Sequence, residues 1–528
     1  MDFDVIVIGS GFGGAITGCR LAQKGKKVLI LERGKEWDKG SYPRAPEDEW
    51  IWSQTSPEHH HGWMDLRIFK GMSVIQGAGV GGGSLIYANI SRVPPESVFQ
   101  KGWPPEITLQ SLANCYDAIG RMLRVNPIPP NQLNPRIKLM RDAATNIGDG
   151  NRFEQIDLAV SFNDDPNFTI DFSAPPDIKN SKSYINEHGA QQGTCAHLGE
   201  CDIGCRVYAK NTLDKNYLPE AVKAGARIWP LHLVTNITPI DGGYRVDHDQ
   251  LTANQRLSGS TTATRVIVAA GSIGSTELLL RCRDKGSLPN LSPFLGKNWS
   301  SNGDFLTPAF HLFHRLWPDR GPTIGSAISY LDGSDNGQVY WIEDGGIPNL
   351  LNKFFQGLMA HIAKAPKGST LSEEFNVHLL LQHLTSFAAH LDGLEHIMPW
   401  FAQGVDAGNG ILSLKNGALD LDWDITKSLG VFEAIAKRHK QLAESTGGIP
   451  MPLPGWTLGK ELITPHALGG CNMGTSSANG VVDHAGKVFG YDNLYVADGS
   501  IVPRALGVNP SRTIGALAER IASLIPAN

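Results

Sequence analysis

The sequence predicts an α/β protein in which a Rossmann-like dinucleotide-binding domain is interleaved with a second, substrate-facing domain. A complete β–α–β pattern occupies the first 32 residues. Strand-and-glycine-turn patterns of the same style return at 265–271 and 493–499. Between about 301 and 460 they give way to aromatics, single histidines and amphipathic stretches. We therefore expect the two ends of the chain to build one domain and the middle to build another.

Composition indicates a soluble globular protein with a large core. The 528 residues are 41% hydrophobic and 19% charged, and the net charge is −5 without a basic stripe, which argues against nucleic-acid binding. No uncharged apolar run is long enough for a membrane span, and no signal sequence precedes the first strand, so we expect a cytoplasmic protein. Seven cysteines, an odd count, fit a reducing compartment.

The first β–α–β unit is predicted element by element. Residues 4–8 consist mostly of β-branched apolar residues, as in a buried parallel strand. The turn Gly9-x-Gly11-x-x-Gly14 follows, and a helix is expected from 15 to 24, with Gly25 as its stop. A second strand at 28–31 ends at Glu32. This order of strand, glycine turn, helix, strand and acidic residue is typical of a dinucleotide site.

Each part of that turn has a physical role. The first glycine permits the tight turn, the second lets backbone approach a pyrophosphate, and the third lets the helix pack on the strand. The helix N-terminus supplies N–H donors to phosphate. Glu32 can accept hydrogen bonds from ribose hydroxyls and disfavours a 2′-phosphate, which argues against NADP. The motif does not separate NAD from FAD.

Further along the chain, a glycine cluster lies at 77–84 in the sequence GAGVGGGS. It could bring backbone amides to the same pyrophosphate or to an isoalloxazine, and the alternative is an ordinary glycine loop. The other expected elements are helices over much of 107–148, strands at 227–240, 244–248 and 265–271, a helix at 275–283, a strand at 493–499 and a closing helix at 513–525. His59-His60-His61 is interpreted as a polar loop, because neighbouring side chains on an extended chain point apart.

Several stretches together resemble the glucose–methanol–choline (GMC) flavin oxidoreductases, and within them the cholesterol oxidases and their bacterial relatives. They are 5–14, 80–85, 209–217 (AKNTLDKNY), 268–279 (VAAGSIGSTELL), 466–471 (HALGGC) and 495–518. They occur in the family order along the whole chain. The resemblance implies an FAD domain of 1–45, 71–160, 201–300 and 461–528. A substrate domain with an antiparallel sheet and helices would comprise 46–70, 161–200 and 301–460.

The resemblance also implies the cofactor contacts. The pyrophosphate would lie at Gly9–Gly14, the ribose at Glu32, the adenine against backbone at Val234, and the ribityl chain and flavin near 498–499 and 509–510. FAD should be noncovalent, because 73–80 contain no histidine. Asn89 is a candidate replacement for a family asparagine whose position holds Tyr87 here. The full expected set is Gly9, Gly11, Phe12, Gly13, Gly14, Glu32, Gly79, Gly81, Gly82, Gly83, Ser84, Asn89, Val234, Ala270, Asp498, Gly499, Asn509 and Pro510.

Three residues are expected to be catalytic. Oxidation of an alcohol requires removal of the hydroxyl proton, which a histidine performs efficiently near neutral pH. The family pattern places His466 over the flavin as the base or as an orienting donor, and Asn509 as a donor to the substrate oxygen. Glu343 corresponds to a glutamate that cholesterol oxidases contribute from the substrate domain. Asp344 is the alternative, and both could instead be a solvated surface pair.

Three cysteines lie within eleven residues, at Cys195, Cys201 and Cys205. They are either small buried thiols, with or without a disulfide, or ligands of an iron–sulfur cluster, for which His197 or Cys471 would have to be the fourth ligand. Apolar pairs such as 354–355, 379–381 and 400–401 could line a pocket, form a lid or belong to the core.

The sequence thus leads to FAD-dependent oxidation of a secondary alcohol on a bulky apolar, sterol-like molecule, with electrons passed to O2. One alternative is a dehydrogenase that uses a quinone or protein electron carrier, acting on an aryl or sugar alcohol. The other is a flavin-binding protein without turnover.

Overall fold

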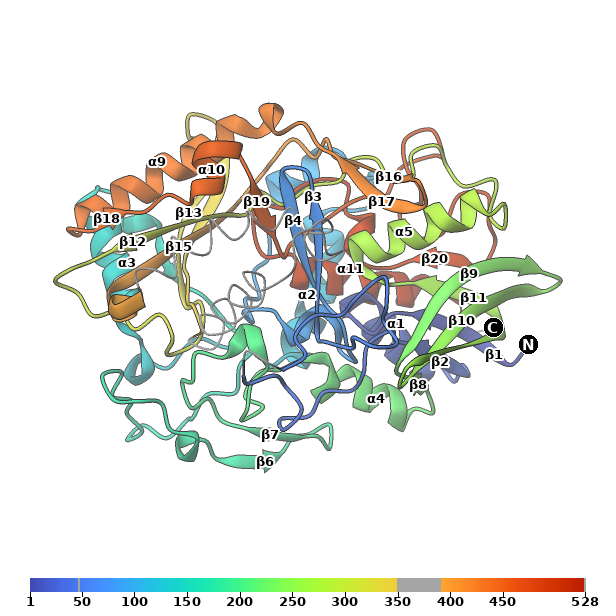
Figure 1. Ribbon diagram of the computed structural model, residues 1–528, viewed down its shortest axis with the longest axis horizontal. Coiled ribbons are helices and arrows are strands. Elements are labelled where there is room, and N and C mark those ends of the chain that lie inside the picture. The colour runs from blue at the N-terminus through green and yellow to red at the C-terminus, as the bar shows by residue number, and fades with distance from the viewer. Residues whose placement is uncertain (46–47, 349–390, 527–528) are drawn as a thin grey trace, which may run out of the picture.

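A computed structural model describes residues 1–45, 48–348 and 391–526. Two sheets dominate it, one at each end of the long axis (Figure 1). The N-terminus and the C-terminus lie side by side at the end that holds the first sheet (Figure 1). Of the apolar pairs noted in the sequence, 354–355 and 379–381 lie outside the described residues.

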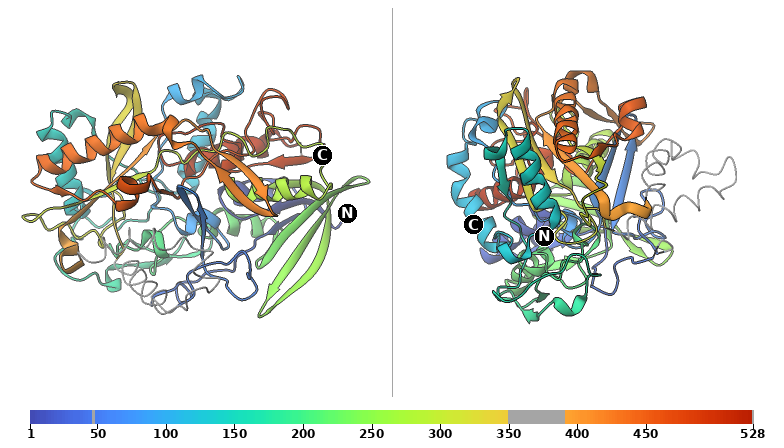
Figure 2. Two further views of the ribbon diagram at one scale, coloured as in Figure 1. Left: turned by 45° about the horizontal axis from the view of Figure 1, so that its top comes forward. Right: turned by 90° about the vertical axis from the view of Figure 1, so that its left-hand side faces the viewer.

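The first sheet has seven strands. Six follow the order β8-β2-β1-β11-β10-β9, and the seventh, β20, pairs with the last residues of β11 on the side opposite β1. The pairings of β1, β2, β8, β11 and β20 are parallel, as expected for a Rossmann-like unit, whereas β9, β10 and β11 pair antiparallel. These three strands form a ribbon that extends from the body (Figure 2). The strands are β1 Phe3–Ile8, β2 Val28–Leu31, β8 Arg227–Trp229, β9 His232–Ile240, β10 Gly243–Thr252, β11 Gln255–Val268 and β20 Leu494–Val496.

The predicted strand at 265–271 is the end of a longer strand. β11 begins ten residues earlier, at Gln255, and its first half is largely exposed. Only its second half, from Ala263, is buried between β1 and β20. The hydrophobic pattern signals the buried half alone, because the exposed half has no apolar face to mark it.

Helices from both ends of the chain cover this sheet. α1 Phe12–Gln23 packs against α11 Ser511–Leu524 and α4 Tyr217–Lys223, and α2 Leu109–Met122 packs against α11. Glu519 joins them: it accepts from Arg20 Nη2 at 2.7 Å and from the Tyr217 hydroxyl at 2.6 Å. α5 Gly271–Asp284 follows β11 directly. Elements from the two ends of the chain therefore pack together around one sheet.

The second sheet is antiparallel throughout, in the order β18-β12-β15-β14-β13-β5. α3 Pro135–Asn146 and α9 Leu429–Ser445 pack against it and share its hydrophobic core. The helical stretch 107–148 is therefore divided between the two sheets. α2 lies with the helices of the first sheet, and α3 packs on the second. The strands are β5 Phe153–Gln155, β12 Phe305–Phe310, β13 Ser326–Asp335, β14 Gln338–Asp344, β15 Ile397–Gly404 and β18 Ile449–Pro450.

A small three-stranded sheet joins the two halves. Its middle strand, β4 Met72–Gly77, pairs antiparallel with β3 Met64–Phe69 and parallel with β19 Leu462–Thr464. β4 runs into the glycine cluster, and β19 ends two residues before His466, so this pairing sets two parts of the expected site side by side. The remaining elements are β6 Ser183–Ile185, β7 Gln191–Gly193, β16 Ile411–Lys415, β17 Ala418–Asp422 and α10 Pro454–Gly459.

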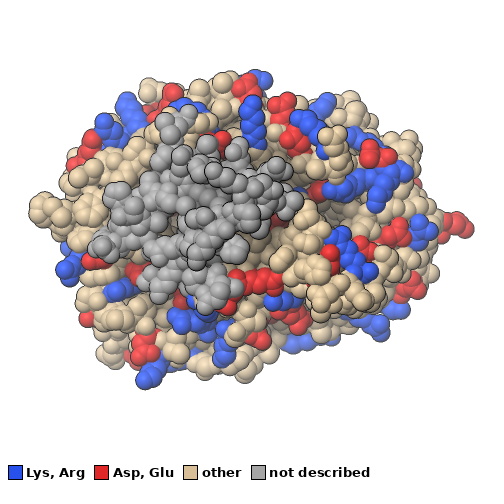
Figure 3. Space-filling model, in the orientation of Figure 1, with Lys and Arg blue, Asp and Glu red and all other residues tan. Residues whose placement is uncertain are grey.

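Within the described residues, no helix has the length and apolar character needed to cross a bilayer. Acidic and basic side chains are interspersed over the face seen in Figure 3, which matches the absence of a basic stripe in the sequence.

Two histidines are enclosed in the second domain without polar partners. Neither ring nitrogen of His439 or of His311 has a hydrogen-bond partner among the described residues. Burial lowers the pKa of His439 to about 3 and that of His311 to about 4. Both rings are therefore neutral in the folded protein near neutral pH.

We predict that these rings make the protein acid-sensitive. Their folded pKa values lie below the unfolded value of about 6.5, so below that pH the unfolded chain binds more protons and the free energy of unfolding falls. Each ring contributes a slope of up to about 1.4 kcal/mol per pH unit. Urea unfolding between pH 7 and 5 measures the slope. His439→Leu is expected to reduce it. Phe432→Leu, in the same core, removes no titrating group and should leave the slope unaltered; equal slopes in all three proteins would contradict the prediction.

Candidate active site

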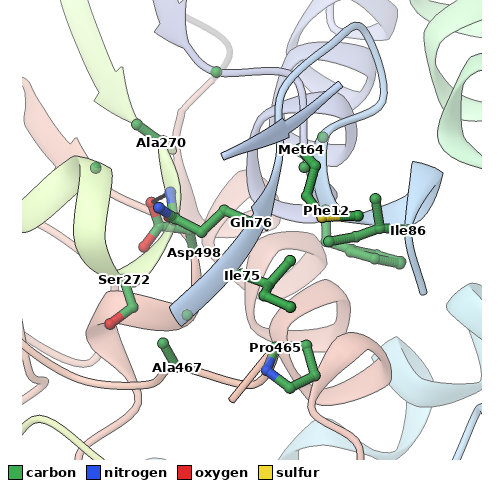
Figure 4. A pocket seen from close by; sticks show the side chains of 18 of the residues that line it. Phe12, Met64, Ile75, Gln76, Ile86, Ala270, Ser272, Pro465, Ala467 and Asp498 are labelled. Atoms are coloured by element: carbon green, nitrogen blue, oxygen red, sulfur yellow. Dashed lines mark hydrogen bonds between the residues drawn. The ribbon is translucent and has the colours of Figure 1, made fainter. Parts of the chain in front are cut away.

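A cavity of about 840 Å³ is lined by residues from both ends of the chain and from the second domain. Its volume lies in the range of small-molecule and cofactor sites. Figure 4 shows side chains from distant segments converging on it, with Phe12, Met64 and Ile86 on one side and Ala270, Ser272, Ala467 and Asp498 on the other. The surface is visibly hollowed beside the grey atoms in Figure 3.

The glycine turn after β1 forms part of the wall. Gly9 has a φ of +96°, a conformation that favours glycine. A Cβ on Gly14 would lie 1.9 Å from the Gly9 carbonyl oxygen, so only glycine lets α1 pack this closely on the strand. Gly11 and Gly83 both line the cavity, and a Cβ on either would meet no atom closer than 3.9 Å. Their open backbone leaves room for the close approach of a ligand such as a pyrophosphate.

Glu32 is held at the end of β2 by three hydrogen bonds. Its Oε2 accepts from the Ser10 hydroxyl at 2.6 Å and the Ser10 backbone N–H at 3.0 Å, and its Oε1 accepts from the Gly34 N–H at 2.9 Å. Burial raises the pKa of Glu32, and these bonds oppose the shift. The carboxylate lines the cavity with Val234, and Oε1 keeps acceptor capacity for a ribose hydroxyl.

Asp498 connects the start of α5 to the C-terminal segment. Its carboxylate accepts from the Gly271 N–H at 2.9 Å, the Ser500 N–H at 2.8 Å, and the hydroxyls of Ser275 and Ser500. Burial raises its pKa, which these donors oppose. With four donors bound to it, the Asp498 carboxylate holds these two segments together at the cavity wall. Figure 4 shows it near Ala270.

The expected cofactor residues divide into two groups. The wall contains Gly9, Gly11, Phe12, Gly13, Glu32, Gly82, Gly83, Val234, Ala270, Asp498, Gly499 and Asn509. Gly14, Gly79, Gly81, Ser84, Asn89 and Pro510 do not line it. Several of these shape the wall from behind: the Ser84 hydroxyl donates to the Gly81 carbonyl at 2.7 Å, and the Gly81 N–H donates to the Ser10 hydroxyl at 3.0 Å.

Tyr87, rather than Asn89, faces the cavity. Its hydroxyl donates to the Asn211 carbonyl at 2.9 Å, and the Lys210 ammonium lies 5.0 Å from its ring centre. Asn89 is fully buried with a φ of +70°, and neither amide atom has a partner among the described residues. Asn89 therefore does not line the cavity, so it does not take the place of the family asparagine whose position holds Tyr87 here.

His466 is paired with a carboxylate that the sequence did not indicate. Its Nδ1 lies 2.8 Å from Asp304 Oδ1, and Asp304 Oδ2 also accepts from the Thr464 hydroxyl at 2.6 Å. Burial by itself lowers the pKa of His466, but the charge and hydrogen bond of Asp304, together with the charges of Glu343 and Asp202, outweigh this effect, so the pKa is raised. Asp304 is fully buried, whereas the imidazole lines the cavity and is 17% exposed. Because Nδ1 faces Asp304, Nε2 is the nitrogen available to a bound molecule.

Asn509 lines the same cavity, and its amide oxygen has no partner among the described residues. The turn before it is held by Asn302, whose Oδ1 accepts from the N–H groups of Leu506 and Gly507 at 2.8 and 3.0 Å. Asn302 Nδ2 also donates to the Val508 carbonyl at 2.9 Å. Asn302 and Asp304 are two residues apart, so one short segment before β12 positions both His466 and Asn509.

Glu343 and Asp344 alternate along β14 and face opposite ways. Glu343 is fully buried, accepts from Trp341 Nε1 at 2.9 Å and Gln403 Nε2 at 3.0 Å, and does not line the cavity. Burial raises its pKa to about 7, and its charge in turn raises that of His466. Asp344 lies 3.7 Å from Arg136 and accepts from the Gly325 N–H at 2.8 Å. Neither is a solvated surface residue.

The cysteine cluster assembles no metal site in the part of the chain that the structure describes. Cys195, Cys201 and Cys205 are free thiols, and burial raises the pKa of Cys195 and Cys201. Of the suggested fourth ligands, His197 Nε2 lies 3.0 Å from Gln132 Oε1, and Cys471 is 3.6 Å from the Thr276 hydroxyl. These groups belong to the packed interior.

The second domain supplies wall residues that sequence analysis missed. They include Leu306, Thr323, Ile324, Gly345, Gly346, Ile347 and Pro399. Phe401, one of the apolar pair at 400–401, also lines the cavity, while Trp400 is fully buried in the core. No local motif marks these positions, because they become neighbours only through the antiparallel sheet.

Comparisons with known proteins agree with this geometry. Residues 185–301 and 424–518 match the family described as GMC oxidoreductase, and residues 7–37 match an NAD(P)-binding Rossmann-like domain. A cholesterol oxidase of Acinetobacter baumannii is 32% identical over 100% of this chain and 95% of its own length. A cholesterol oxidase of Mycobacterium tuberculosis is 31% identical, with 99% and 91% covered.

Among solved structures, pyridoxine 4-oxidase from Mesorbium loti matches with a TM-score of 0.63 over 99% of both chains, at 15% identity, which is a likeness of fold. The full-length similarity to the two cholesterol oxidases goes further than fold. The chain belongs to the glucose–methanol–choline (GMC) oxidoreductase family.

Proposed function

We propose that this oxidoreductase, whose family acts on CH–OH groups, converts a secondary alcohol on a bulky apolar, sterol-like molecule to the ketone and passes the electrons to O2. The observation that carries the proposal is the pairing of His466 with Asp304 at the wall of a large, mainly apolar cavity. The two most similar relatives described above, both named cholesterol oxidase, support the substrate class.

Noncovalently bound FAD fits the cavity along the line of its wall residues. Glu32 would hold the ribose, Gly11 and Gly83 the pyrophosphate, and the region of Asp498 and Asn509 the ribityl chain and ring. When bound, FAD supplies the hydride acceptor. The open space at the two cavity-facing glycines is the feature of this chain that fits such a group.

His466 is proposed as the base that takes the hydroxyl proton on Nε2. The Nδ1–H donates to Asp304, which keeps the neutral ring in the tautomer with a free lone pair on Nε2. As the hydroxyl proton arrives, the ring becomes an imidazolium that the Asp304 carboxylate stabilises. The alcohol loses this proton and a hydride from its carbon, and the C–O bond becomes a carbonyl.

Asn509 is proposed to donate to the substrate oxygen from its side-chain amide. An amide cannot take the proton, so it orients the oxygen without competing with His466. The segment at Asn302 that clamps the preceding turn keeps this amide in place.

Apolar side chains from the second domain line the cavity, and the ring centres of Phe401 and His466 lie 6.3 Å apart. Leu306, Ile324, Ile347, Pro399 and Phe401 all lie on this wall. They offer burial rather than hydrogen bonds, which suits a large hydrocarbon skeleton better than a sugar.

We predict that the purified holoprotein is yellow and that sterol-sized secondary alcohols bleach its flavin under anaerobic conditions faster than aryl carbinols or sugars do. Admission of air is expected to restore the absorbance within the turnover time, because O2 is the proposed acceptor. A panel of the three substrate types followed by stopped-flow absorbance measures both steps. Bleaching without reoxidation in air would contradict the oxidase assignment and favour a quinone or protein acceptor.

Asp304→Asn is predicted to lower kcat by roughly 10²–10⁴, because the tautomer and the imidazolium lose their support. His466 must be neutral to accept the proton, so the wild-type rate falls as the pH drops through its raised pKa. Removal of the Asp304 charge lowers that pKa, and the acidic limb of the kcat/KM profile moves to lower pH. Asp406→Asn is the control, at a buried aspartate that accepts hydrogen bonds from Ser300 and Ser301. The acidic limb of its kcat/KM profile is expected to coincide with that of the wild type.

Glu343→Gln tests which group is the base. Its carboxylate is bonded to Trp341 and Gln403 and acts on His466 only through its charge. We expect kcat to fall less than about tenfold and the acidic limb to move down by less than in Asp304→Asn. Loss of about 10³ in kcat together with loss of the limb would instead make Glu343 the base.

A further inference from the structure

The cavity contains one carboxylate that the proposed reaction does not use. Asp202 lies on the 3-10 turn Cys201–Ile203 and lines the cavity together with Thr323, Ile324 and His466. No ion pair reaches it from the described residues within 4.0 Å. It is close enough to His466 for the two charges to influence each other.

The cation with the largest effect on Asp202 is bonded to other groups. Lys210 is 3% exposed, and its ammonium donates to the Leu85 carbonyl at 3.0 Å and the Cys201 carbonyl at 2.5 Å. The same ammonium lies over the Tyr87 ring. Lys210 therefore favours the ionised form of Asp202 from a distance without occupying its acceptor sites. Thr323, the neighbour on the wall, also favours the ionised form.

A purely apolar ligand would leave this carboxylate with no donor other than Thr323. Sealing an ionised carboxylate against hydrocarbon is costly unless it receives hydrogen bonds. Burial raises the pKa of Asp202 to about 6, so the group is largely ionised near neutral pH. The mainly apolar wall therefore contains one group, the Asp202 carboxylate, that needs a hydrogen-bond donor from the ligand.

We propose that Asp202 is a specificity-determining residue and that the substrate bears a second hydroxyl group, which donates to this carboxylate while the reacting hydroxyl lies at His466. The inference rests on the proposed function, because it takes His466 as the reacting end. A neutral donor fits better than an ammonium, since Lys210 and the imidazolium formed at His466 already place positive charge beside the carboxylate. The substrate class is thus a diol on a large apolar skeleton.

The experiment uses the flavin-loaded full chain and pairs of secondary alcohols that differ only by a second hydroxyl, placed at several positions on the skeleton. Anaerobic flavin reduction gives kcat/KM for each. We expect the wild type to prefer at least one diol over its mono-ol by roughly 10- to 100-fold, as for a hydrogen bond to a charged group. Asp202→Asn is expected to reduce that preference to below about threefold, and Asp202→Leu to abolish or reverse it.

The diol-to-mono-ol ratio within one variant separates recognition from folding, because a general loss of stability lowers both rates together. Asp214→Asn is the matched control: Asp214 also acts on Lys210 and pairs with Lys215 at 2.8 Å, but it does not line the cavity. Its ratio should equal that of the wild type. Flavin absorbance per chain verifies that each variant is loaded.

The outcomes are distinguishable. If the wild type oxidises mono-ols as well as every diol, and Asp202→Asn changes both equally, the role of Asp202 is overturned while the proposed function stands. A preference for amino alcohols over diols that Asp202→Asn removes would overturn the choice of a neutral donor. If no alcohol bleaches the flavin, the proposed function fails and this inference fails with it.

Discussion

The contact between the two ends of the chain is the constraint on which the rest of the structure depends. A Cβ at Gly13 would lie 1.7 Å from the carbonyl oxygen of Ala497, so the start of α1 touches the backbone that follows β20 directly. β1 and β20 flank β11 in parallel, which brings the first glycine turn and the C-terminal segment to the same edge of one sheet. The carboxyl ends of parallel strands are where such folds bind ligands, and the cavity opens there.

The second domain does more than shape the far wall. The short segment before β12 carries Asn302 and Asp304, which reach back to the turn before Asn509 and to His466. The tautomer of the histidine and the position of the asparagine are thus set by a residue pair in the inserted domain, although both proposed catalytic groups belong to the C-terminal segment. The set of groups around the cavity is complete only where both parts of the chain meet.

Features that depend on neighbouring residues could be predicted from the sequence. The strand, glycine turn, helix and acidic residue at the N-terminus follow from local patterns, and the order of motifs along the chain indicated the family, with His466 and Asn509 as its site residues. Asp304 could not be predicted, because the sequence around it contains no motif and its partner, His466, is 162 residues away. Glu343 could be chosen as a candidate from the sequence, but the direction of its side chain could not be predicted, because the face that a strand residue occupies depends on the pairing of the strand in the sheet. Asp202 lies among the cysteines, which drew attention to metal chemistry instead.

The charges around His466 suit the role of base that is proposed for this enclosed imidazole. Burial disfavours the imidazolium, but the carboxylates of Asp304, Glu343 and Asp202 all act in the opposite direction, and only Asp304 touches the ring. These groups are already fixed before a substrate arrives, so little reorganisation accompanies proton transfer. The same arrangement concentrates negative charge in a cavity with apolar walls. The carboxylates of Asp304 and Glu343 accept hydrogen bonds from protein donors, whereas Asp202 lines the cavity itself. The group that is least satisfied by the protein is therefore the one with most influence on which molecule fits.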